Sequence, residues 1–518
     1  LLLRALKDRT RHSTVDFTHT AARLHWLCKQ TGHPSHPLEV FRARAGRIQK
    51  GLFLPNGKDE AYDLKAVCEG LAAFYQTHVP EDVQKRLPRH WRPAPAPAEK
   101  VLQAKRIRIT VHRWDEHFIY GKDHTHPTEQ LLKVEYADET DRTFADLNGQ
   151  LYEGAQLNLL SVKAIKAEGA YPYVLKPEML VLDPDFLIDI TALCACIKPY
   201  GYSAYTHLLN KFAPPARSAA IQLGNAANQF LDDCVNERFI QNADGTTEAE
   251  LYLRSMQNSF RFSPLAWSTL PDIDRDFFNR CEMQFHHIRQ TVRNSFSAAG
   301  IDIRQTEVEL EPSFLCEALG LQGRMDLLTR NADKLVELKS GKADEYPYHS
   351  PKEEHSLQMA LYKEILYYNL DRRREQVQSY LFYSRYPGLY AVDVPRSHIR
   401  RAMALRNAIL HIEHRLRRGE SRTLIEELTE ERLNVDGRAD RLYSRYLRPR
   451  MMEILAPLHG MRGVEADYFH RFLTFTAREQ FRAKVGDDRA DSPGGFAETW
   501  CCDTQTKQQN GNILTGLK

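Results

Sequence analysis

The sequence has no apolar run of about 18 residues, the length that a helix needs to span a membrane. It has no G-x-x-x-x-G-K-[S/T] loop, so no P-loop ATP site is visible in it. Its nine cysteines show neither paired C-x-x-C spacing nor a disulfide framework, and we expect reduced thiols in a cytoplasmic protein. The formal net charge is only +3, so local charge is more informative than the overall balance.

A chain of 518 residues is long enough for several domains. Alternating prolines in the first hundred residues indicate a stiff, extended linker. Several short alternating segments follow and predict a small barrel of strands. We expect a multidomain α/β (α+β) protein with a helical domain (1–91), a Pro-rich linker (92–100), an OB-like β-barrel (101–187), a mixed α/β domain (188–394), a helical stalk (395–485) and a flexible tail (486–518).

Charged residues gather on a predicted β-hairpin. The apolar-rich runs 325–329 and 335–339 flank turn-like residues. Alternation puts Glu337 and Lys339 on one face, and Asp326 can face Glu337 across the hairpin. Two carboxylates and a backbone carbonyl are enough protein ligation for Mg²⁺, which keeps several waters. The alternative is an ordinary surface hairpin, because E-x-K is a common pattern.

A helix is predicted directly after the hairpin. The segment 350–353, Ser-Pro-Lys-Glu, has the pattern of a capping box with proline at the first helical position. A buried stripe is expected from Leu357, Leu361, Ile365 and Tyr368. Beside this stripe, His355, Gln358 and Tyr362 share one face, from which they could contact a phosphate or a metal-bound water. A solvated helix flank is the alternative.

These residues together resemble a known family. The motifs, in this order and spacing, are Gly323-x-x-Asp326, Glu337-x-Lys339 and Gln358-x-x-x-Tyr362. They resemble the RecB-type branch of the PD-(D/E)XK nucleases, over residues 189–394. The resemblance implies a restriction-endonuclease-like core with a mixed central sheet flanked by helices, and a Mg²⁺- or Mn²⁺-dependent nuclease that acts on DNA ends or single strands. It also implies that Asp326 and Glu337 bind the metal, that Lys339 positions or activates water, and that Gln358 and Tyr362 contact the substrate.

The sequence departs from the family in one motif. The family has an upstream Gly-x-x-x-His helix whose histidine can bind metal, and here Asn228 stands in place of that histidine, after Gly224. The amide oxygen of Asn228 could meet a hard cation, or it could form a structural hydrogen bond inside the helix packing. A family glutamate near residues 307–311 also helps to bind metal, and we assign Glu309 to this role. A solvated strand face is the alternative.

Some relatives carry an iron–sulfur cluster with one cysteine before the nuclease core and three after it. Cys194 and Cys196 lie near the first position, but after Tyr362 the next cysteines are Cys501 and Cys502. A cluster needs four thiolates within reach, so no cluster is expected.

Several residues are candidates for contacts with nucleic acid. Arg324 and His355 flank the predicted site, and Arg400, Arg401 and Arg415 lie on a basic helix that could follow a phosphate backbone. The alternative for this helix is a solvated face packed on the nuclease. A later helix carries Tyr468, Phe472 and Phe475 at i, i+4 and i+7, a spacing that favours core over a base-stacking platform.

The order of helical arm, β-module, nuclease and helical stalk resembles the front half of a bacterial nuclease-helicase of DNA replication, recombination or repair. The resemblance implies DNA as a partner and a helicase motor, either beyond Lys518 or in another protein. The rival hypothesis is an inactive nuclease-fold scaffold that binds nucleic acid for such a motor, and Asn228 is the feature that favours it. No membrane partner is expected.

Overall fold

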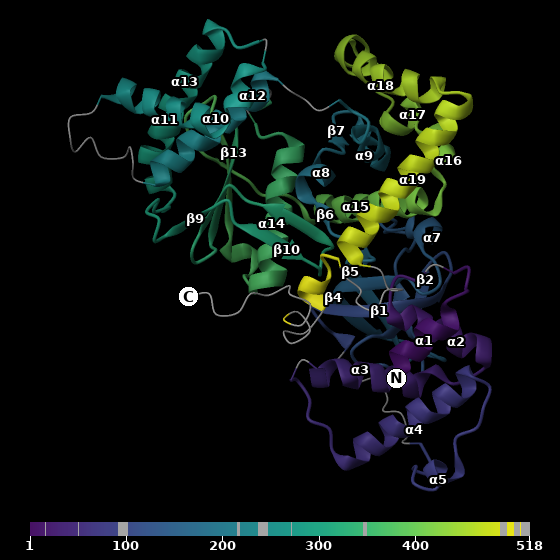
Figure 1. Cartoon of the computed structure of the whole chain (residues 1–518). Helices are drawn as coiled ribbons and strands as arrows, with labels where there is room; N and C mark the ends of the chain where they lie inside the picture. Colours follow the sequence, from purple (N-terminus) through teal and green to yellow (C-terminus); the bar gives the residue numbers. More distant parts are fainter. Residues whose placement is uncertain are drawn as a thin grey trace.

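The chain forms a mixed α/β structure. A β-barrel lies between the N-terminal helices on one side and, on the other side, a mixed sheet with its helices and the C-terminal helices (Figure 1). This computed structural model describes residues 1–15, 17–49, 51–91, 102–214, 218–236, 247–270, 272–344, 350–486, 495–501 and 508. The predicted Pro-rich linker and most of the predicted flexible tail lie outside the described residues. Among the helices of the described ranges, none has both the length and the apolar character to cross a membrane.

Residues 1–91 are helical, as their pattern predicts. The helices are α1 (Leu2–Thr10), α2 (Thr20–Thr31), α3 (Ser35–Gln49), α4 (Gly57–Phe74) and α5 (Glu81–Gln84). Asn56 begins α4 through a capping box with Asp59, which satisfies backbone N–H groups that the first helical turn leaves free. Leu6, Leu24 and Phe74 are fully buried in a small core of their own.

The predicted small β-barrel is confirmed. Its elements are β1 (Arg106–Trp114), β2 (Phe118–Asp123), β3 (Leu132–Glu135), α7 (Leu147–Gln150), β4 (Gln156–Lys166) and β5 (Tyr173–Leu182). The strands close in the order β1-β2-β3-β5-β4, with β3 and β5 parallel and the other pairs antiparallel. Ile107, Ile109 and Val111 alternate along β1 and fill the interior, so period-2 patterning determines which side of each strand is buried.

The region after the barrel contains helices on both sides of a mixed sheet. Its first part comprises β6 (Ile188–Asp189), α8 (Ile190–Cys194), β7 (Ile197–Lys198), β8 (Gly201–Tyr202), α9 (Ala204–Asn210), α10 (Ala219–Val235), α11 (Glu248–Phe262), α12 (Pro264–Ser268), α13 (Arg275–Thr291) and the π-helix η1 (Val292–Phe296). Its second part comprises β9 (Val308–Leu310), β10 (Ser313–Cys316), β11 (Leu321–Arg324), β12 (Leu327–Thr329), β13 (Lys334–Lys339), α14 (Glu353–Leu370), η2 (Arg374–Gln376), β14 (Gln378–Tyr383) and β15 (Tyr390–Ala391).

The central sheet has the order β15-β14-β13-β12-β9, in which only β13 and β14 are parallel. On one face Leu335 and Leu381 join the large core that includes α14 and the barrel. On the other face Val336 and Leu338 join a second core with α10 and α13. Figure 1 shows these teal helices over the sheet at the upper left. Odd-numbered side chains of β13 therefore point toward α14, and even-numbered ones point toward α10.

The start of α14 differs from the prediction. The helix begins at Glu353, and Lys352 at its N-cap makes no side-chain capping bond. Ser350 instead forms a β-bridge with Asp344, and the Lys352 amide donates to the Tyr383 hydroxyl at 3.0 Å. These sheet-side contacts hold residues 350–352 extended, so the Ser-Pro-Lys-Glu pattern does not act as a capping box here.

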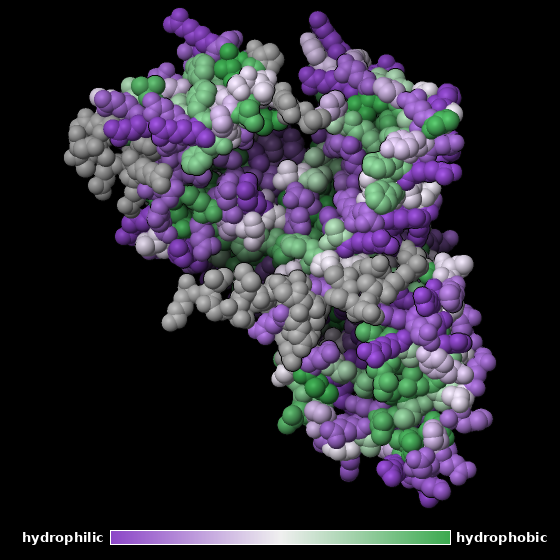
Figure 2. All heavy atoms as spheres, viewed as in Figure 1, coloured by the Kyte–Doolittle hydropathy of each residue, from purple (hydrophilic) through white to green (hydrophobic). Residues whose placement is uncertain are grey.

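The last part of the described chain is helical. It comprises α15 (Arg396–Arg418), α16 (Ser421–Glu427), α17 (Glu430–Leu433), the π-helix η3 (Tyr443–Leu447), α18 (Arg448–Gly460), α19 (Gly463–Val485) and α20 (Glu498–Cys501). The prediction of a core role for Tyr468, Phe472 and Phe475 is wrong, because α19 turns all three rings to solvent. Figure 2 shows the surface hollowed between the helices over the sheet and these C-terminal helices.

Candidate active site

A hairpin of β12 and β13 brings the two predicted acids opposite each other. Leu327 pairs with Val336, so the residue before β12, Asp326, lies across from Glu337. The Asp326 Oδ2 atom accepts a hydrogen bond from the Leu338 amide at 2.7 Å. The position of Asp326 is therefore fixed from β13 itself, and its Oδ1 atom accepts no hydrogen bond from the residues that the structure describes.

Glu337 and Lys339 meet on the α14 face of β13. The Lys339 Nζ atom donates to Glu337 Oε1 at 2.8 Å. The exposed fraction of the side chain is 5% for Glu337 and 21% for Lys339. The ammonium group therefore lies nearer to solvent than the carboxylate that accepts from it.

The helix α14 supplies a second donor to the same carboxylate. Gln358 Nε2 lies 2.8 Å from Glu337 Oε1 and 3.1 Å from the Tyr362 hydroxyl. The Tyr362 hydroxyl donates to the Arg324 carbonyl at 2.7 Å. A chain of hydrogen bonds thus joins β13, α14 and β11 and restrains the side chains of Glu337, Gln358 and Tyr362.

Gly323 makes room for this chain. A Cβ atom at Gly323 would lie 2.8 Å from Cε1 of Tyr362, closer than real Cβ contacts allow. The first residue of the Gly-x-x-Asp motif is therefore required by the packing of the tyrosine ring on β11.

The ionisable groups of the site shift one another's pKa values. Burial raises the pKa of Asp326 to about 8, and Glu337 raises it in the same direction, while Lys339 opposes the shift. Burial works against the ammonium form of Lys339, but the carboxylate of Glu337 raises the Lys339 pKa above its ordinary value. Two neighbouring acids thus face a single ammonium group.

One oxygen of Glu337 is unpaired. Oε1 accepts both hydrogen bonds, and Oε2 is buried with no hydrogen-bond partner among the described residues. A buried carboxylate oxygen without a partner costs free energy unless a donor or cation meets it. The unpaired Oε2 and the raised pKa of Asp326 both fit a divalent cation held between the two acids, since hard cations prefer carboxylate oxygens.

The region that contains this site was compared with known protein families. Residues 189–436 match the family model of the PD-(D/E)XK nuclease superfamily. The region is a PD-(D/E)XK nuclease superfamily domain. Its match extends past residue 394, where the sequence predicted the domain to end, and takes in α15, α16 and α17. No curated protein matches the chain.

Glu309 does not lie with the acids of the nuclease domain. It pairs with Leu328 on the edge of the sheet, its side chain is exposed, and its Oε1 atom lies 3.7 Å from Arg330 Nη1. The glutamate at the level of Asp326 is Glu311, whose amide donates to the Asp326 carbonyl at 3.0 Å and whose charge helps to raise the Asp326 pKa. The alternation of the three glutamates included Glu311 but did not fix the strand register.

Asn228 lies on α10, which covers the sheet face opposite to Glu337. Asn228 is half-buried, and its side-chain amide forms no hydrogen bond within the described ranges. Four residues earlier, Gly224 packs against the sheet, and a Cβ atom there would lie 3.2 Å from Ser340 Oγ.

Asp232, which the sequence prediction missed, has its pKa raised to about 6 by burial and then by Glu311.

Two of the predicted nucleic-acid-binding arginines are engaged within the protein. Arg400 donates from Nε to the Glu178 carbonyl at 2.9 Å and pairs with Asp141. Arg415 binds both oxygens of Glu427, at 2.6 and 2.9 Å. The predicted basic face of this helix is therefore corrected at these positions: acidic partners on other elements neutralise the two guanidinium groups and tie α15 to its surroundings.

Arg324 and Arg401 keep exposed guanidinium groups. Arg401 lies over the Tyr202 ring at 4.3 Å from its centroid. Arg324 Nη1 lies 3.1 Å from Glu311 Oε2, in an ion pair whose two side chains are both open to water. Exposed pairs of this kind are weak, so a phosphate can compete for Arg324.

His355 is not a cation at neutral pH. Burial lowers its pKa to about 3, and Lys339 acts in the same direction. Its Nδ1 atom shares a hydrogen bond of 2.8 Å with the Tyr383 hydroxyl. His355 therefore supports the start of α14 and cannot attract a phosphate by charge.

Cys194 and Cys196 are both buried, and burial raises the pKa of each thiol, that of Cys196 to about 12. Cys502, the last cysteine considered for a cluster, lies outside the described residues.

Proposed function

We propose that the nuclease domain is a divalent-metal-dependent deoxyribonuclease that hydrolyses phosphodiester bonds at DNA ends or in single strands. The observation that supports this proposal best is the buried arrangement of Asp326, Glu337 and Lys339, in which Glu337 Oε2 has no hydrogen-bond partner among the described residues. The superfamily match over the same residues supports a nuclease-type function.

Asp326 and Glu337 would hold the cation, Mg²⁺ or Mn²⁺. When bound there, the ion would supply Lewis-acid polarisation of the phosphate and acidification of a water molecule. The raised pKa of Asp326 is consistent with such an ion, because a cation stabilises the charged form that burial and Glu337 disfavour.

The remaining residues have roles that follow from their contacts. Lys339 keeps its proton, so it orients the attacking water and offsets the charge that develops on the phosphate. Gln358 donates to Glu337 and thereby holds the carboxylate in its rotamer. The Tyr362 hydroxyl accepts from Gln358 and donates to the Arg324 carbonyl, so it holds Gln358 in place. It stays protonated because burial raises the pKa of Tyr362.

Replacing Lys339 by Met is expected to lower cleavage of labelled single-stranded DNA in Mg²⁺ by at least about a hundredfold, because the variant loses a charge aimed at the developing phosphate charge. Mn²⁺ binding should persist, since both carboxylates remain. The matched control is Lys58→Met, at an exposed lysine in the first turn of α4. Cleavage by the Lys339 variant at the wild-type rate would overturn this assignment.

A second candidate function is an inactive nuclease-fold scaffold that clamps nucleic acid. The presence of Asn228, where the family has a metal-binding histidine, favours it. A scaffold of this kind predicts that the wild-type chain binds DNA but leaves it uncut in either Mg²⁺ or Mn²⁺. Metal-dependent cutting by the wild-type chain would therefore exclude it.

We also propose that the chain works with a helicase motor, in the same polypeptide or in a partner. The order of helices, barrel, nuclease domain and helices supports this proposal. The sequence has no P-loop of its own, so the motor would be supplied from outside these residues. DNA-stimulated ATPase activity that copurifies with the full-length protein would support it.

A further inference from the structure

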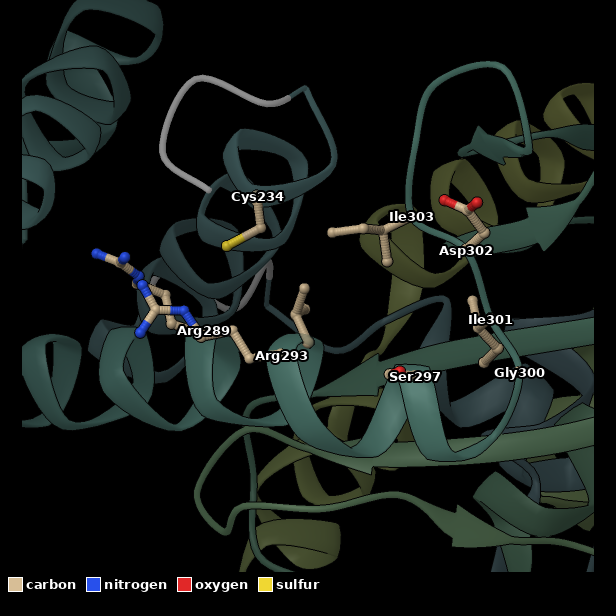
Figure 3. Close-up of a pocket in the computed structure, with 9 residues that line it drawn as sticks. Cys234, Arg289, Arg293, Ser297, Gly300, Ile301, Asp302 and Ile303 are labelled. Atoms are coloured by element: carbon tan, nitrogen blue, oxygen red, sulfur yellow. The ribbon is translucent and has the colours of Figure 1, made fainter. Parts of the chain in front are cut away.

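A pocket of about 570 Å³ lies on the helical side of the nuclease domain, away from the acidic hairpin. The end of α10, the end of α13, the π-helix η1 and the segment 300–303 form its walls (Figure 3). Gly224 near the hairpin and Cys234 in the pocket are ten residues apart on α10, which places the pocket roughly 15 Å from that end of the sheet.

Arg289 is the buried cation of this pocket. Its side chain is only 3% exposed, and its Nη1 atom has no hydrogen-bond partner among the described residues. Its nearest acid is Glu248, with 3.5 Å between Nε and Oε1, and that glutamate is itself largely open to water. A buried guanidinium with a free N–H group carries a desolvation cost that an anion would relieve.

Arg293 adds a second positive charge one turn later. It is exposed, and it makes no ion pair with a residue that the structure describes. Burial lowers the pKa of Arg289, and Arg293 lowers it further, while Glu248 opposes the shift. Both guanidinium groups also act on the Cys234 thiol, and Figure 3 shows them on the same side of the pocket as its sulfur. Two like charges held together in this way favour the binding of a counter-anion.

The other walls agree with an anionic ligand. Ser297 lines the end of the pocket that is farther from the two guanidinium groups, where its hydroxyl can donate to another part of a ligand (Figure 3). Asp302 is neutralised by Arg304, whose Nε atom lies 2.9 Å from Asp302 Oδ2. Ile301 and Ile303 form an apolar wall against which a sugar or base can pack. The π-helix that shapes the pocket is a rare conformation that occurs frequently at functional sites.

We propose that this pocket binds a phosphoryl group, with Arg289 and Arg293 as its ligands. Planar guanidinium groups match the geometry of phosphate oxygens, and the cavity is large enough for a nucleoside monophosphate. The phosphoryl group belongs either to a free nucleotide or to the 5′ end of a DNA strand. The site does not depend on the proposed nuclease chemistry, since the residues that line it are separate from those of the acidic hairpin.

The test measures binding to the full chain in EDTA, where a metal-dependent nuclease cannot act. The probes for calorimetry are dAMP and a short oligonucleotide with or without a 5′-phosphate. Charge-assisted hydrogen bonds of this kind are worth about tenfold or more in affinity, so Arg293→Glu should weaken binding of the phosphorylated probe by at least about tenfold. Arg289→Gln should do the same. Arg254→Glu, the same charge change at an exposed position of α11, should leave affinity within about twofold.

Arg293 is exposed, so its variant tests the proposal even if the Arg289 variant fails to fold. If dAMP binds more tightly than the 5′-phosphorylated oligonucleotide, the pocket is assigned to a free nucleotide. If the 5′-phosphorylated oligonucleotide binds more tightly than both dAMP and the unphosphorylated oligonucleotide, the pocket is assigned to a strand end. Failure of the wild-type chain to bind either phosphorylated probe would overturn the proposal. Equal affinity of wild type and Arg293→Glu would overturn it as well, and neither result would bear on DNA cleavage at Glu337.

Discussion

Replacement of Glu337 by Gln is expected to lower the rate of DNA cleavage by about a thousandfold or more, because a metal ligand supplies several kcal/mol of transition-state stabilisation. The glutamine keeps the shape of the side chain, and its Oε1 atom can still accept from Lys339 and Gln358. The variant removes the negative charge and places an amide nitrogen at the position of Oε2. The measurement is cleavage of labelled single-stranded DNA with Mg²⁺ or Mn²⁺.

The matched control for this variant is Glu307→Gln. Glu307 is an exposed glutamate just before the edge strand β9, and the same change there removes one charge without touching the acidic hairpin. The control should cut DNA at the wild-type rate. A Glu337 variant that retains cleavage within about tenfold of wild type, with its fold intact, would contradict a metal-ligand role, because loss of a ligand costs far more than this.

Replacement of Arg406 by Met is expected to destabilise the protein by about 3–5 kcal/mol, because several buried carbonyls lose their donor and each unsatisfied group costs about 1–3 kcal/mol. Arg406 is fully buried on α15 and donates to the carbonyls of Gly320, at 3.3 Å, and Phe186, at 2.8 Å, and also to the Leu182 carbonyl. It therefore joins the end of the barrel to the nuclease domain and α15. Methionine fills similar volume but leaves these carbonyls without donors.

Thermal and denaturant unfolding measure this effect, with intrinsic fluorescence and circular dichroism as separate probes. Arg418→Met on the same helix is the control, because Arg418 is exposed and lies 5.2 Å from the Tyr152 ring centroid. Its loss should cost less than about 1 kcal/mol. If the Arg406 variant were as stable as this control, the proposed clamp between barrel and nuclease domain would be wrong.

The hairpin was predictable because its information is local. Alternation along residues 335–339 determines that Glu337 and Lys339 share a face, and the structure brings them to a hydrogen bond. Helical spacing likewise predicted that Gln358 and Tyr362 project together, as they do. The barrel followed from period-2 alternation, whereas the mixed central sheet was implied by the family resemblance.

The wrong predictions have a common cause in partners that lie on other elements. Local patterns do not reveal that Arg415 binds Glu427 on the next helix, or that Tyr383 holds the Lys352 amide and delays the start of α14. Register on an edge strand likewise decides between Glu309 and Glu311, and the alternation leaves that register open.

The exposed rings on α19 show the limit of periodicity in another way. An amphipathic stripe such as Tyr468 and Phe472 predicts burial only if another element covers it. The pocket around Arg289 could not be predicted either. It forms where α10 and α13 meet, and these helices are far apart in the sequence.

The central claim is that Asp326 and Glu337 bind one divalent cation together, and calorimetric titration with Mn²⁺ tests it most directly. Titrations in two buffers of different ionisation heat, repeated between about pH 6.5 and 8.5, also report proton release. Because burial and the neighbouring Glu337 raise the pKa of Asp326 above its usual value, its carboxyl keeps a proton to higher pH and must lose that proton to bind the ion. Affinity should therefore increase as the pH rises toward this pKa, with proton release at the lower pH values.

We expect one Mn²⁺ site in the wild-type chain that shows this proton release, and no corresponding heat in Glu337→Gln or Asp326→Asn. An unchanged Mn²⁺ heat in both variants, or a wild-type chain that binds no Mn²⁺, would contradict it.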